Sequence, residues 1–244
     1  MSPQEKVNKT PQGEELDGFP EALVALRDPA SAASEAYRML RTNLFYAQVD
    51  TPPKVIVLTS VGRGEGKSTT VANLGVTLAQ AGKSTLILDC DLRRPAQHKV
   101  FGIGNVTGLV DVLVGDQVPH EVWTEPIPDL KLMPAGPPPP NPAEILTSRR
   151  LTEFLGQMRQ QFDYVLVDTP PMAHVAEAAG LAANGDGVLL ILDSQHTRRG
   201  ALRQALRALR SVRANMLGTV MNKHEVPRGA AAEAGYYSVV ATDK

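Results

Sequence analysis

The chain has 244 residues, enough for one sizeable α/β domain with flanking segments. Its formal net charge is -1, so the overall charge gives no reason to expect nucleic acid or an acidic membrane surface as a partner. The single cysteine, Cys90, excludes an internal disulfide, and the polar start MSPQEKVNKT lacks the apolar stretch of a secretory signal. The longest candidate for a membrane span, GVLLILD, is far shorter than the roughly 20 residues required, so we expect a cytoplasmic protein without a direct membrane span.

The N-terminal part of the sequence predicts an arm followed by a helix. Residues 1–30 are rich in Pro, Glu, Asp and Gly and show little apolar periodicity, so we expect a flexible arm outside the core. Residues 31–47 place Tyr37, Leu40 and Leu44 at helical spacing, and DTPP follows them. This spacing predicts a helix over 31–47.

From Lys54 onward, short apolar runs alternate with helical stretches. Six runs are predicted as strands: KVIVLTS, STLILDCD, LKLMPAG, YVLVDTPP, GVLLILD and LGTVMNK. Helices are predicted at residues 67–81 and around residues 144–160, 174–184 and 197–213. Strands separated by helices indicate an α/β fold with a doubly wound, mostly parallel sheet and helices on both faces, which binds its ligand at the carboxyl ends of the strands.

The C-terminal part predicts a second flexible segment. We expect the folded domain to cover residues 31–225 and to be followed by a tail over residues 226–244. The tail consists of small and polar residues until GYYSVV, which contains Tyr236 and Tyr237.

The stretch GRGEGKSTT follows the first predicted strand and begins the helix after it. Gly64 and Gly66 allow the backbone to turn its N–H groups toward an anion, Lys67 adds positive charge, and Ser68 offers a hydroxyl to Mg²⁺. The strict pattern has Gly in place of Val61, but strand, loop and helix occur in the order that phosphate binding requires. We therefore predict a P-loop NTPase domain whose nucleotide-binding residues are Gly64, Glu65, Gly66, Lys67, Ser68 and Thr69.

Three aspartates lie where predicted strands end. ILDCDLRRP contains Asp89 and Asp91, and YVLVDTPP contains Asp168. Each alone could be a helix cap or turn former. Together they would be costly to bury without a cation, and Mg²⁺ prefers such hard oxygen ligands. Beside a phosphate loop they indicate a site for ATP and Mg²⁺.

These motifs resemble those of the bacterial tyrosine kinases, or BY-kinases, of capsule and exopolysaccharide synthesis. The resemblance rests on GEGKST, LILDCDLRRP and VLVDTPP and extends to GLVDVLVG, PAGPPPPNPAEIL and GTVMNK, so it covers about Asp28 to Lys223. Partitioning ATPases usually carry an extra lysine at the place that matches Gly62 here. The resemblance implies an ATP-dependent protein-tyrosine autokinase, with Asn222 as a further nucleotide-binding residue.

The resemblance also implies roles for the site residues. Lys67 would hold the β- and γ-phosphates, Ser68 and Asp168 would bind Mg²⁺, and Asp89 would join the metal shell or orient the acceptor. Asp91 is a second candidate for accepting the proton of the tyrosine hydroxyl, and the sequence does not rank it against Asp89. The nearby Arg63, Arg93 and Arg94 could add positive charge or be solvated.

The segment EAYRMLR places Glu35, Arg38 and Arg41 three residues apart, across one side of the predicted helix. By itself this pattern is typical of a solvated face with weak ion pairs. In BY-kinases such a helix takes part in ring-shaped self-assembly, in which one subunit presents its tail to the next. The resemblance therefore implies assembly by these three residues and phosphorylation of Tyr236 and Tyr237. Family members commonly carry a longer tyrosine cluster, so the number of phosphates stays open.

By the same resemblance, a membrane-embedded polysaccharide chain-length regulator would activate the kinase and bring it to the inner face of the membrane. Two other functions stay open: a partitioning or positioning ATPase switch without a protein acceptor, and a regulatory nucleotide-binding subunit with little catalysis. Gly62 and the tail tyrosines favour the kinase over the switch.

One further pattern has no assigned function. RRGALRQALRALRSVR places four arginines along one helical stripe: Arg203, Arg207, Arg210 and Arg213. This stripe is either a solvated basic face or a docking surface for an acidic partner or anionic lipid.

Overall fold

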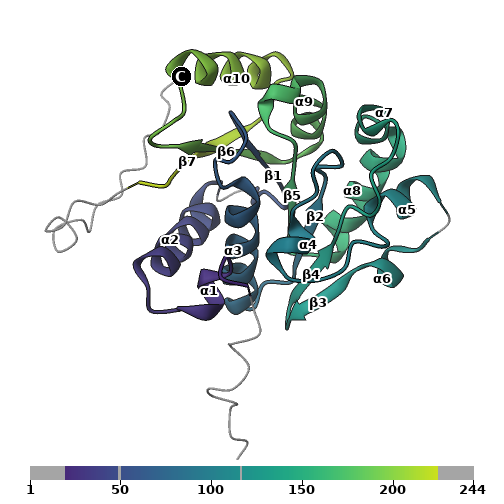
Figure 1. The fold of residues 1–244 in the computed structure, drawn as a ribbon, viewed down its shortest axis with the longest axis horizontal. Helices are drawn as coiled ribbons and strands as arrows, with labels where there is room; N and C mark the ends of the chain where they lie inside the picture. Colours follow the sequence, from purple (N-terminus) through teal and green to yellow (C-terminus); the bar gives the residue numbers. More distant parts are fainter. Residues whose placement is uncertain (1–19, 49–50, 116, 225–244) are drawn as a thin grey trace, which may run out of the picture.

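The computed structural model describes residues 20–48, 51–115 and 117–224. Figure 1 shows a central sheet with helices packed on both sides. The elements in chain order are α1 (Val24–Arg27), α2 (Ala32–Tyr46), β1 (Val55–Ser60), α3 (Lys67–Gln80), β2 (Thr85–Asp89), α4 (Gln97–Val100), α5 (Leu109–Val114), α6 (Pro119–Val122), β3 (Thr124–Ile127), β4 (Leu130–Met133), α7 (Pro142–Leu146), α8 (Arg149–Gln161), β5 (Tyr164–Asp168), η2 (Met172–His174), α9 (Val175–Asn184), β6 (Gly187–Asp193), α10 (Arg199–Ser211) and β7 (Met216–Asn222).

Seven strands form one sheet in the order β3-β4-β2-β5-β1-β6-β7. All neighbouring strands run parallel except β3 and β4, which are antiparallel. The doubly wound, mostly parallel α/β fold and the six predicted strands are confirmed. Strand β3 was not predicted, because it is a short, half-exposed edge strand that contains Pro126, a residue that weakens a strand pattern.

The residues of each central strand alternate between two apolar layers. In β1, Val55 and Val57 face the layer that includes α5, α7, α8, α9 and α10, whereas Ile56 and Leu58 face the layer of α1, α2 and α3. Successive side chains of a strand point to opposite faces, and helices cover both faces here, so the strand is apolar throughout. The carboxyl ends of β1, β2 and β5 then lie side by side at one edge of the sheet.

The predicted boundary of the N-terminal arm is wrong for its last third. Leu23, Ala25 and Leu26 are buried against α3, and α1 packs on both α2 and α3. Asn73 of α3 fixes this segment, because its Oδ1 accepts from the N–H of Ala25 at 2.9 Å and its Nδ2 donates to the carbonyl of Ala22 at 2.8 Å. This apolar run is too short to show a period in the sequence, yet long enough to fill the space beside α3.

The two ends of the chain lie outside the described residues, so the flexible arm over 1–19 and the tail over 226–244 stay predictions. The helix predicted to reach Arg213 ends earlier, at Ser211, and Arg213 has a left-handed backbone with φ 55°. Within the described residues, no helix is both long enough and apolar enough to cross a membrane.

Candidate nucleotide site

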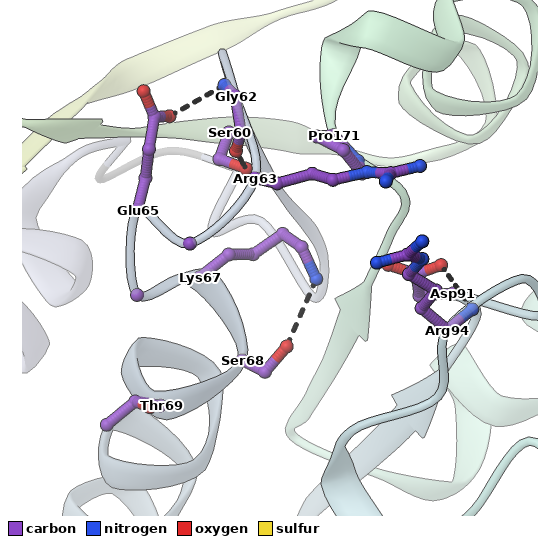
Figure 2. Close-up of a pocket in the computed structure, with 12 residues that line it drawn as sticks. Ser60, Gly62, Arg63, Glu65, Lys67, Ser68, Thr69, Asp91, Arg94 and Pro171 are labelled. Carbon is purple, nitrogen blue, oxygen red and sulfur yellow. Dashed lines mark hydrogen bonds between the residues drawn. The ribbon is translucent and has the colours of Figure 1, made fainter. Parts of the chain in front are cut away.

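The phosphate loop lies between β1 and α3, where Figure 2 shows its residues around a cavity. Gly64 and Gly66 have φ of 73° and 88°, in the region that favours glycine. A Cβ on Gly66 would lie 1.9 Å from Nδ2 of Asn222, so a larger residue there would have to displace the Asn222 side chain from the loop. The cavity has a volume of about 290 Å³ and is lined by Ser60, Gly62, Arg63, Gly64, Glu65, Gly66, Lys67, Ser68, Thr69, Asp91, Arg94 and Pro171.

One side of this loop, which we call the inner flank, faces the ends of β2 and β5. Lys67 is 7% exposed, and its Nζ forms an ion pair with Asp168 and lies 3.2 Å from Oγ of Ser68. Lys67 and Ser68 begin α3, and Asp168 ends β5, so the parallel sheet brings the three together as the sequence predicted. They place a buried cation and two hard oxygen donors beside the loop.

Gln97 is an inner-flank residue that the sequence analysis missed. It is fully buried at the start of α4, and its Nε2 donates to Oδ2 of Asp168 at 2.6 Å and to the carbonyl of Ser68 at 3.0 Å. Its backbone N–H donates to Oδ2 of Asp89 at 2.9 Å. Among the described residues, Oε1 has no hydrogen-bond partner. A glutamine in a four-residue helix gives no sequence signal, because its role depends on three segments that meet only after folding.

The two aspartates of the ILDCDLRRP motif have different surroundings. Asp89 is fully buried and accepts from the backbone N–H groups of Asp91 at 3.2 Å, Ala96 at 2.9 Å and Gln97, so its carboxylate shapes the loop after β2. Burial and the neighbouring charge of Asp168 raise the pKa of Asp89. Asp91 lines the cavity, accepts from the N–H of Arg94 at 3.1 Å, and also has a pKa raised by burial.

The oxygen donors of the inner flank fit a magnesium nucleotide. Mg²⁺ is usually held by one or two carboxylates, phosphate oxygens and water, and Ser68 with Asp168 offers such a hydroxyl and carboxylate. The unpartnered Oε1 of Gln97 adds a buried acceptor next to them. Among the residues that the structure describes, no group of three or more His, Cys, Asp or Glu is placed to hold a metal by itself. The geometry therefore suits an ion that arrives with phosphate oxygens.

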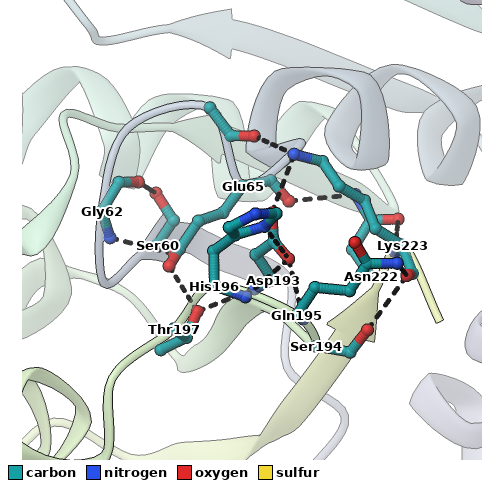
Figure 3. Close-up of polar contacts among 11 residues, drawn as sticks. Ser60, Gly62, Glu65, Asp193, Ser194, Gln195, His196, Thr197, Asn222 and Lys223 are labelled. Atoms are coloured by element: carbon teal, nitrogen blue, oxygen red, sulfur yellow. Dashed lines mark hydrogen bonds and ion pairs between the residues drawn. The ribbon is translucent and has the colours of Figure 1, made fainter.

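The other side of the loop, the outer flank, is held by residues from the ends of β6 and β7 (Figure 3). The Glu65 carboxylate accepts from the N–H of Gly62 at 2.9 Å and from the hydroxyl of Thr197. Asn222 donates through Nδ2 to the carbonyl of Glu65 at 2.9 Å. The predicted nucleotide-binding residues Glu65 and Asn222 thus use their side chains to hold the loop.

A charged pair completes the outer flank. Nζ of Lys223 donates to the carbonyl of Gly64 at 2.6 Å and lies 2.9 Å from Oδ2 of Asp193. The hydrogen bond from Lys223 lowers the pKa of Asp193 well below its usual range. The last strand of the sheet is thereby connected to the backbone of the phosphate loop.

The three arginines near the site divide into two groups. Arg93 is engaged by the buried Glu177 of α9, with Nη2 to Oε1 at 2.7 Å and Nε to Oε1 at 2.9 Å. Arg63 and Arg94 line the cavity, and Nη2 of Arg63 lies 3.3 Å from Nε2 of His174. Positive charge for a bound phosphate can therefore come from Arg63 and Arg94, whereas Arg93 connects the loop after β2 to α9.

The predicted assembly residues lie on α2. Nε of Arg38 pairs with Glu35 at 2.7 Å, and its Nη2 donates to the carbonyl of Pro29 at 2.8 Å. Nη1 of Arg41 donates to the carbonyl of Thr77 on α3 at 2.9 Å. Each arginine thus has a partner within its own domain, and the role of the three residues in assembly stays a prediction. The predicted phosphoacceptors, Tyr236 and Tyr237, lie outside the described residues.

Comparisons of the sequence with known proteins agree with this site. A family model described as an AAA domain matches residues 53–222, which span the phosphate loop and all three aspartates. Tyrosine-protein kinase YwqD of Bacillus subtilis is 38% identical over 216 residues, which cover 88% of this chain and 90% of that protein. Tyrosine-protein kinase CpsD of Streptococcus agalactiae is 32% identical over 196 residues, which cover 80% of this chain and 85% of that protein.

Solved structures support the same relationship. The chimerical protein CapA2B2 matches with a TM-score of 0.79 at 33% identity, covering 83% of this chain and 90% of that one. The kinase domain of Escherichia coli tyrosine kinase ETK matches with a TM-score of 0.78 at 28% identity, covering 84% of this chain and 82% of that one. The septum site-determining protein MinD of Pyrococcus horikoshii, at 23% identity and a TM-score of 0.59, shares the fold. The chain therefore belongs to the bacterial tyrosine-protein kinases, the family that its motifs indicated.

Proposed function

We propose that this kinase transfers the γ-phosphate of ATP to Tyr236 and Tyr237 in the tail of a neighbouring copy, and that it thereby regulates the synthesis and export of a capsular or extracellular polysaccharide. The observation that carries the proposal is the position of Lys67, which lies at the mouth of the phosphate loop between Ser68 and Asp168. A lysine in this position is the group that P-loop enzymes use on the β- and γ-phosphates.

The inner flank supplies the charges that transfer requires. Lys67 would exchange the Asp168 carboxylate for the phosphates, and Ser68 and Asp168 would hold Mg²⁺, with Asp89 behind them at the end of β2. When bound, Mg²⁺ neutralises charge on the phosphates. The backbone N–H groups around Gly64 and Gly66 and the N-terminus of α3 add positive potential. Transfer needs mainly positioning and charge neutralisation, and these groups provide both.

In the transfer step, the tyrosine hydroxyl oxygen forms a bond to the γ-phosphorus, and the bond from that phosphorus to the ADP oxygen breaks. ADP leaves with the electron pair, and the hydroxyl proton passes to a carboxylate. Asp91 is favoured over Asp89 as that acceptor, because Asp91 lines the cavity whereas three backbone N–H groups occupy the oxygens of Asp89.

Assembly and recruitment complete the proposal. Ring-like association through Glu35, Arg38 and Arg41 would bring one tail to the next active site. A membrane-embedded chain-length regulator would activate the kinase at the inner face of the cell membrane. Support comes from the family and from Glu35, whose side chain is 60% exposed. The alternative of a switch ATPase without a protein acceptor is less well supported, because its relative MinD is far less similar than YwqD.

The test is incubation of purified protein with Mg²⁺ and γ-labelled ATP, with and without the cytoplasmic segment of a candidate regulator, followed by mass spectrometry of the tail. We expect label on Tyr236 or Tyr237 and a loss of at least about 10²-fold in Lys67→Ala, because the cation on the phosphates is removed. The exposed Lys83→Ala is the matched control. Release of free phosphate without tyrosine label, even with the regulator, would favour the switch ATPase.

A further inference from the structure

Helix α10 and its two flanking segments form the most basic stretch of the chain. Residues 198–213 contain six arginines and no acidic residue: Arg198, Arg199, Arg203, Arg207, Arg210 and Arg213. The remainder of the chain then contains 19 Lys and Arg against 26 Asp and Glu, so positive charge is concentrated on a domain that is otherwise acidic. Neither ATP binding nor phosphoryl transfer, as described above, uses these side chains.

Four of the arginines form one exposed face of α10, and Arg198 and Arg213 flank the helix. At about 100° per residue, Arg199, Arg203, Arg207 and Arg210 fall within roughly 80° of the helix circumference. All six arginines are exposed, whereas Ala205 and Leu209 on the other side of α10 are buried against the sheet. Within the part of the chain that the structure describes, none of the six forms an ion pair. We call these six residues the arginine face.

We propose that the arginine face binds the kinase's own tail, residues 225–244, once Tyr236 and Tyr237 carry phosphate, and that it thereby holds the reacted tail away from the nucleotide site. This inference rests on the proposed function, because it assumes that the tail is phosphorylated. It assigns α10 a role in retaining the product of the reaction.

The path of the chain supports this occupant. Strand β7 ends at Asn222, which pairs with Asp193 at the end of β6. The carbonyl of Lys223 accepts from Oγ of Ser194 at 3.0 Å, in the short loop that leads into α10. The chain therefore leaves the described structure beside the start of α10. At about 3.3 Å per residue, the segment up to Tyr236 can extend about 40 Å, twice the roughly 20 Å length of the helix.

Charge gives the face its selectivity for the phosphorylated form. The unmodified tail has three acidic and two basic side chains, so it has little attraction to a basic surface. Each phosphotyrosine adds about −1.5 to −2 charges and three strong acceptor oxygens, which the planar guanidinium group binds in a bidentate manner. The arginine face has no acidic residue, whereas the phosphate-binding groups of the nucleotide site lie beside three aspartates and are taken by ATP. Phosphorylation therefore raises the affinity of the tail for α10 relative to the active site.

The binding test uses a fluorescent synthetic peptide of residues 224–244, either phosphorylated on both tyrosines or unmodified. The receptor is the full chain with Tyr236→Phe and Tyr237→Phe, so that its own tail stays unphosphorylated. By fluorescence polarisation we expect the phosphopeptide to bind at least about tenfold more tightly than the unmodified peptide. The Arg203→Glu/Arg207→Glu double variant should remove that preference.

Two controls keep the result specific. The Lys83→Glu/Lys99→Glu variant makes the same change of charge on other exposed surfaces and should bind like the parent chain. The milder Arg203→Gln/Arg207→Gln variant tests the face if charge reversal disturbs folding, which circular dichroism would report. Equal binding of the two peptides, or phosphopeptide binding that is unchanged in both arginine variants, would overturn the proposal.

A membrane surface is the main competing occupant. Sedimentation with vesicles of phosphatidylcholine and phosphatidylglycerol measures this directly. Vesicle binding that depends on Arg203 and Arg207, without any preference for the phosphopeptide, would replace the tail with anionic lipid. Because the phosphates on the peptide are synthetic, this outcome is independent of whether the kinase labels its own tyrosines. Failure of the arginine face and failure of tail phosphorylation are therefore separate results.

Discussion

The inner and outer flanks of the phosphate loop are both polar, but they are built differently. On the inner flank, charged groups are buried together: Lys67 faces Asp168, and Asp89 lies behind them with a raised pKa. On the outer flank, Asn222 at the end of β7, the following Lys223 and Thr197 before α10 form hydrogen bonds with the loop itself, and Asp193 of β6 pairs with Lys223.

This difference separates two tasks. Buried charges that face one another can exchange partners when phosphate and metal bind, so the inner flank is suited to chemistry. Hydrogen bonds from side chains to loop backbone fix the shape of the anion-binding loop, so the outer flank is suited to pre-organisation. Variants of the two flanks should consequently differ in which kinetic constant they change.

The largest effect is expected where the two flanks meet, at Gly66. In Gly66→Ala the new Cβ would lie 1.9 Å from Nδ2 of Asn222 at a φ of 88°, so either the loop or the outer flank must move. We expect ATP affinity, measured by isothermal titration calorimetry, to fall by at least about 10²-fold, because the backbone N–H groups of the loop no longer point toward the same phosphate.

Gly64→Ala is the matched control for this variant. Its φ of 73° is equally unfavourable, but no atom lies within 4 Å of the added Cβ. It should therefore lose only about tenfold from backbone strain of 1–2 kcal/mol. Equal losses in the two variants would show that contact with Asn222 does not determine the shape of the loop.

An intermediate effect is expected from Gln97 on the inner flank. Gln97→Leu keeps the volume but removes the donor to Asp168 and to the carbonyl of Ser68. Groups that orient metal ligands typically contribute about 10–100-fold to metal affinity or activity. We therefore expect kcat to fall by about that factor and the Mg²⁺ concentration that gives the half-maximal rate to rise.

Magnesium titrations of the steady-state rate measure this, with the exposed Gln204→Leu on α10 as control. Gln97→Glu is a second probe, because it places another carboxylate against Asp168 and should weaken the site unless Mg²⁺ is raised. A normal magnesium dependence in both variants would mean that Gln97 serves only to pack α4.

The smallest effect is expected on the outer flank. Lys223→Met removes the donor to the carbonyl of Gly64 and the partner of Asp193, but the Asn222 contact with Glu65 remains. We expect KM for ATP to rise roughly two- to fivefold with kcat unchanged, as befits the loss of one partly exposed hydrogen bond. Lys83→Met is the control. A fall in kcat with unchanged KM would erase the distinction between the flanks.

Much of the fold and part of the site could be predicted from the sequence. The runs VIVLTS, TLILD and YVLVD are apolar because both faces of their strands are covered, and this uniform burial is visible in composition. Short peripheral elements escaped prediction: β3 is half-exposed, and α1 is too short for a period. The P-loop was predictable because phosphate binding requires a short, fixed order of residues. The aspartates were predictable because each lies at or just after the end of an apolar strand run.

The sequence by itself determined the α/β architecture, the phosphate loop and the family, since each depends on residues that are close together in the chain. Only the tertiary structure decided which side chains meet: Gln97 with Asp168, Lys223 with Gly64, and Arg41 with Thr77. It also separated the arginines of α2, which have partners, from those of the arginine face of α10, which form no ion pair with any described residue. The spacing of the arginines alone does not reveal this difference. The physical reason is that hydrogen bonds and ion pairs between distant segments depend on how the layers pack, and local sequence does not specify that packing.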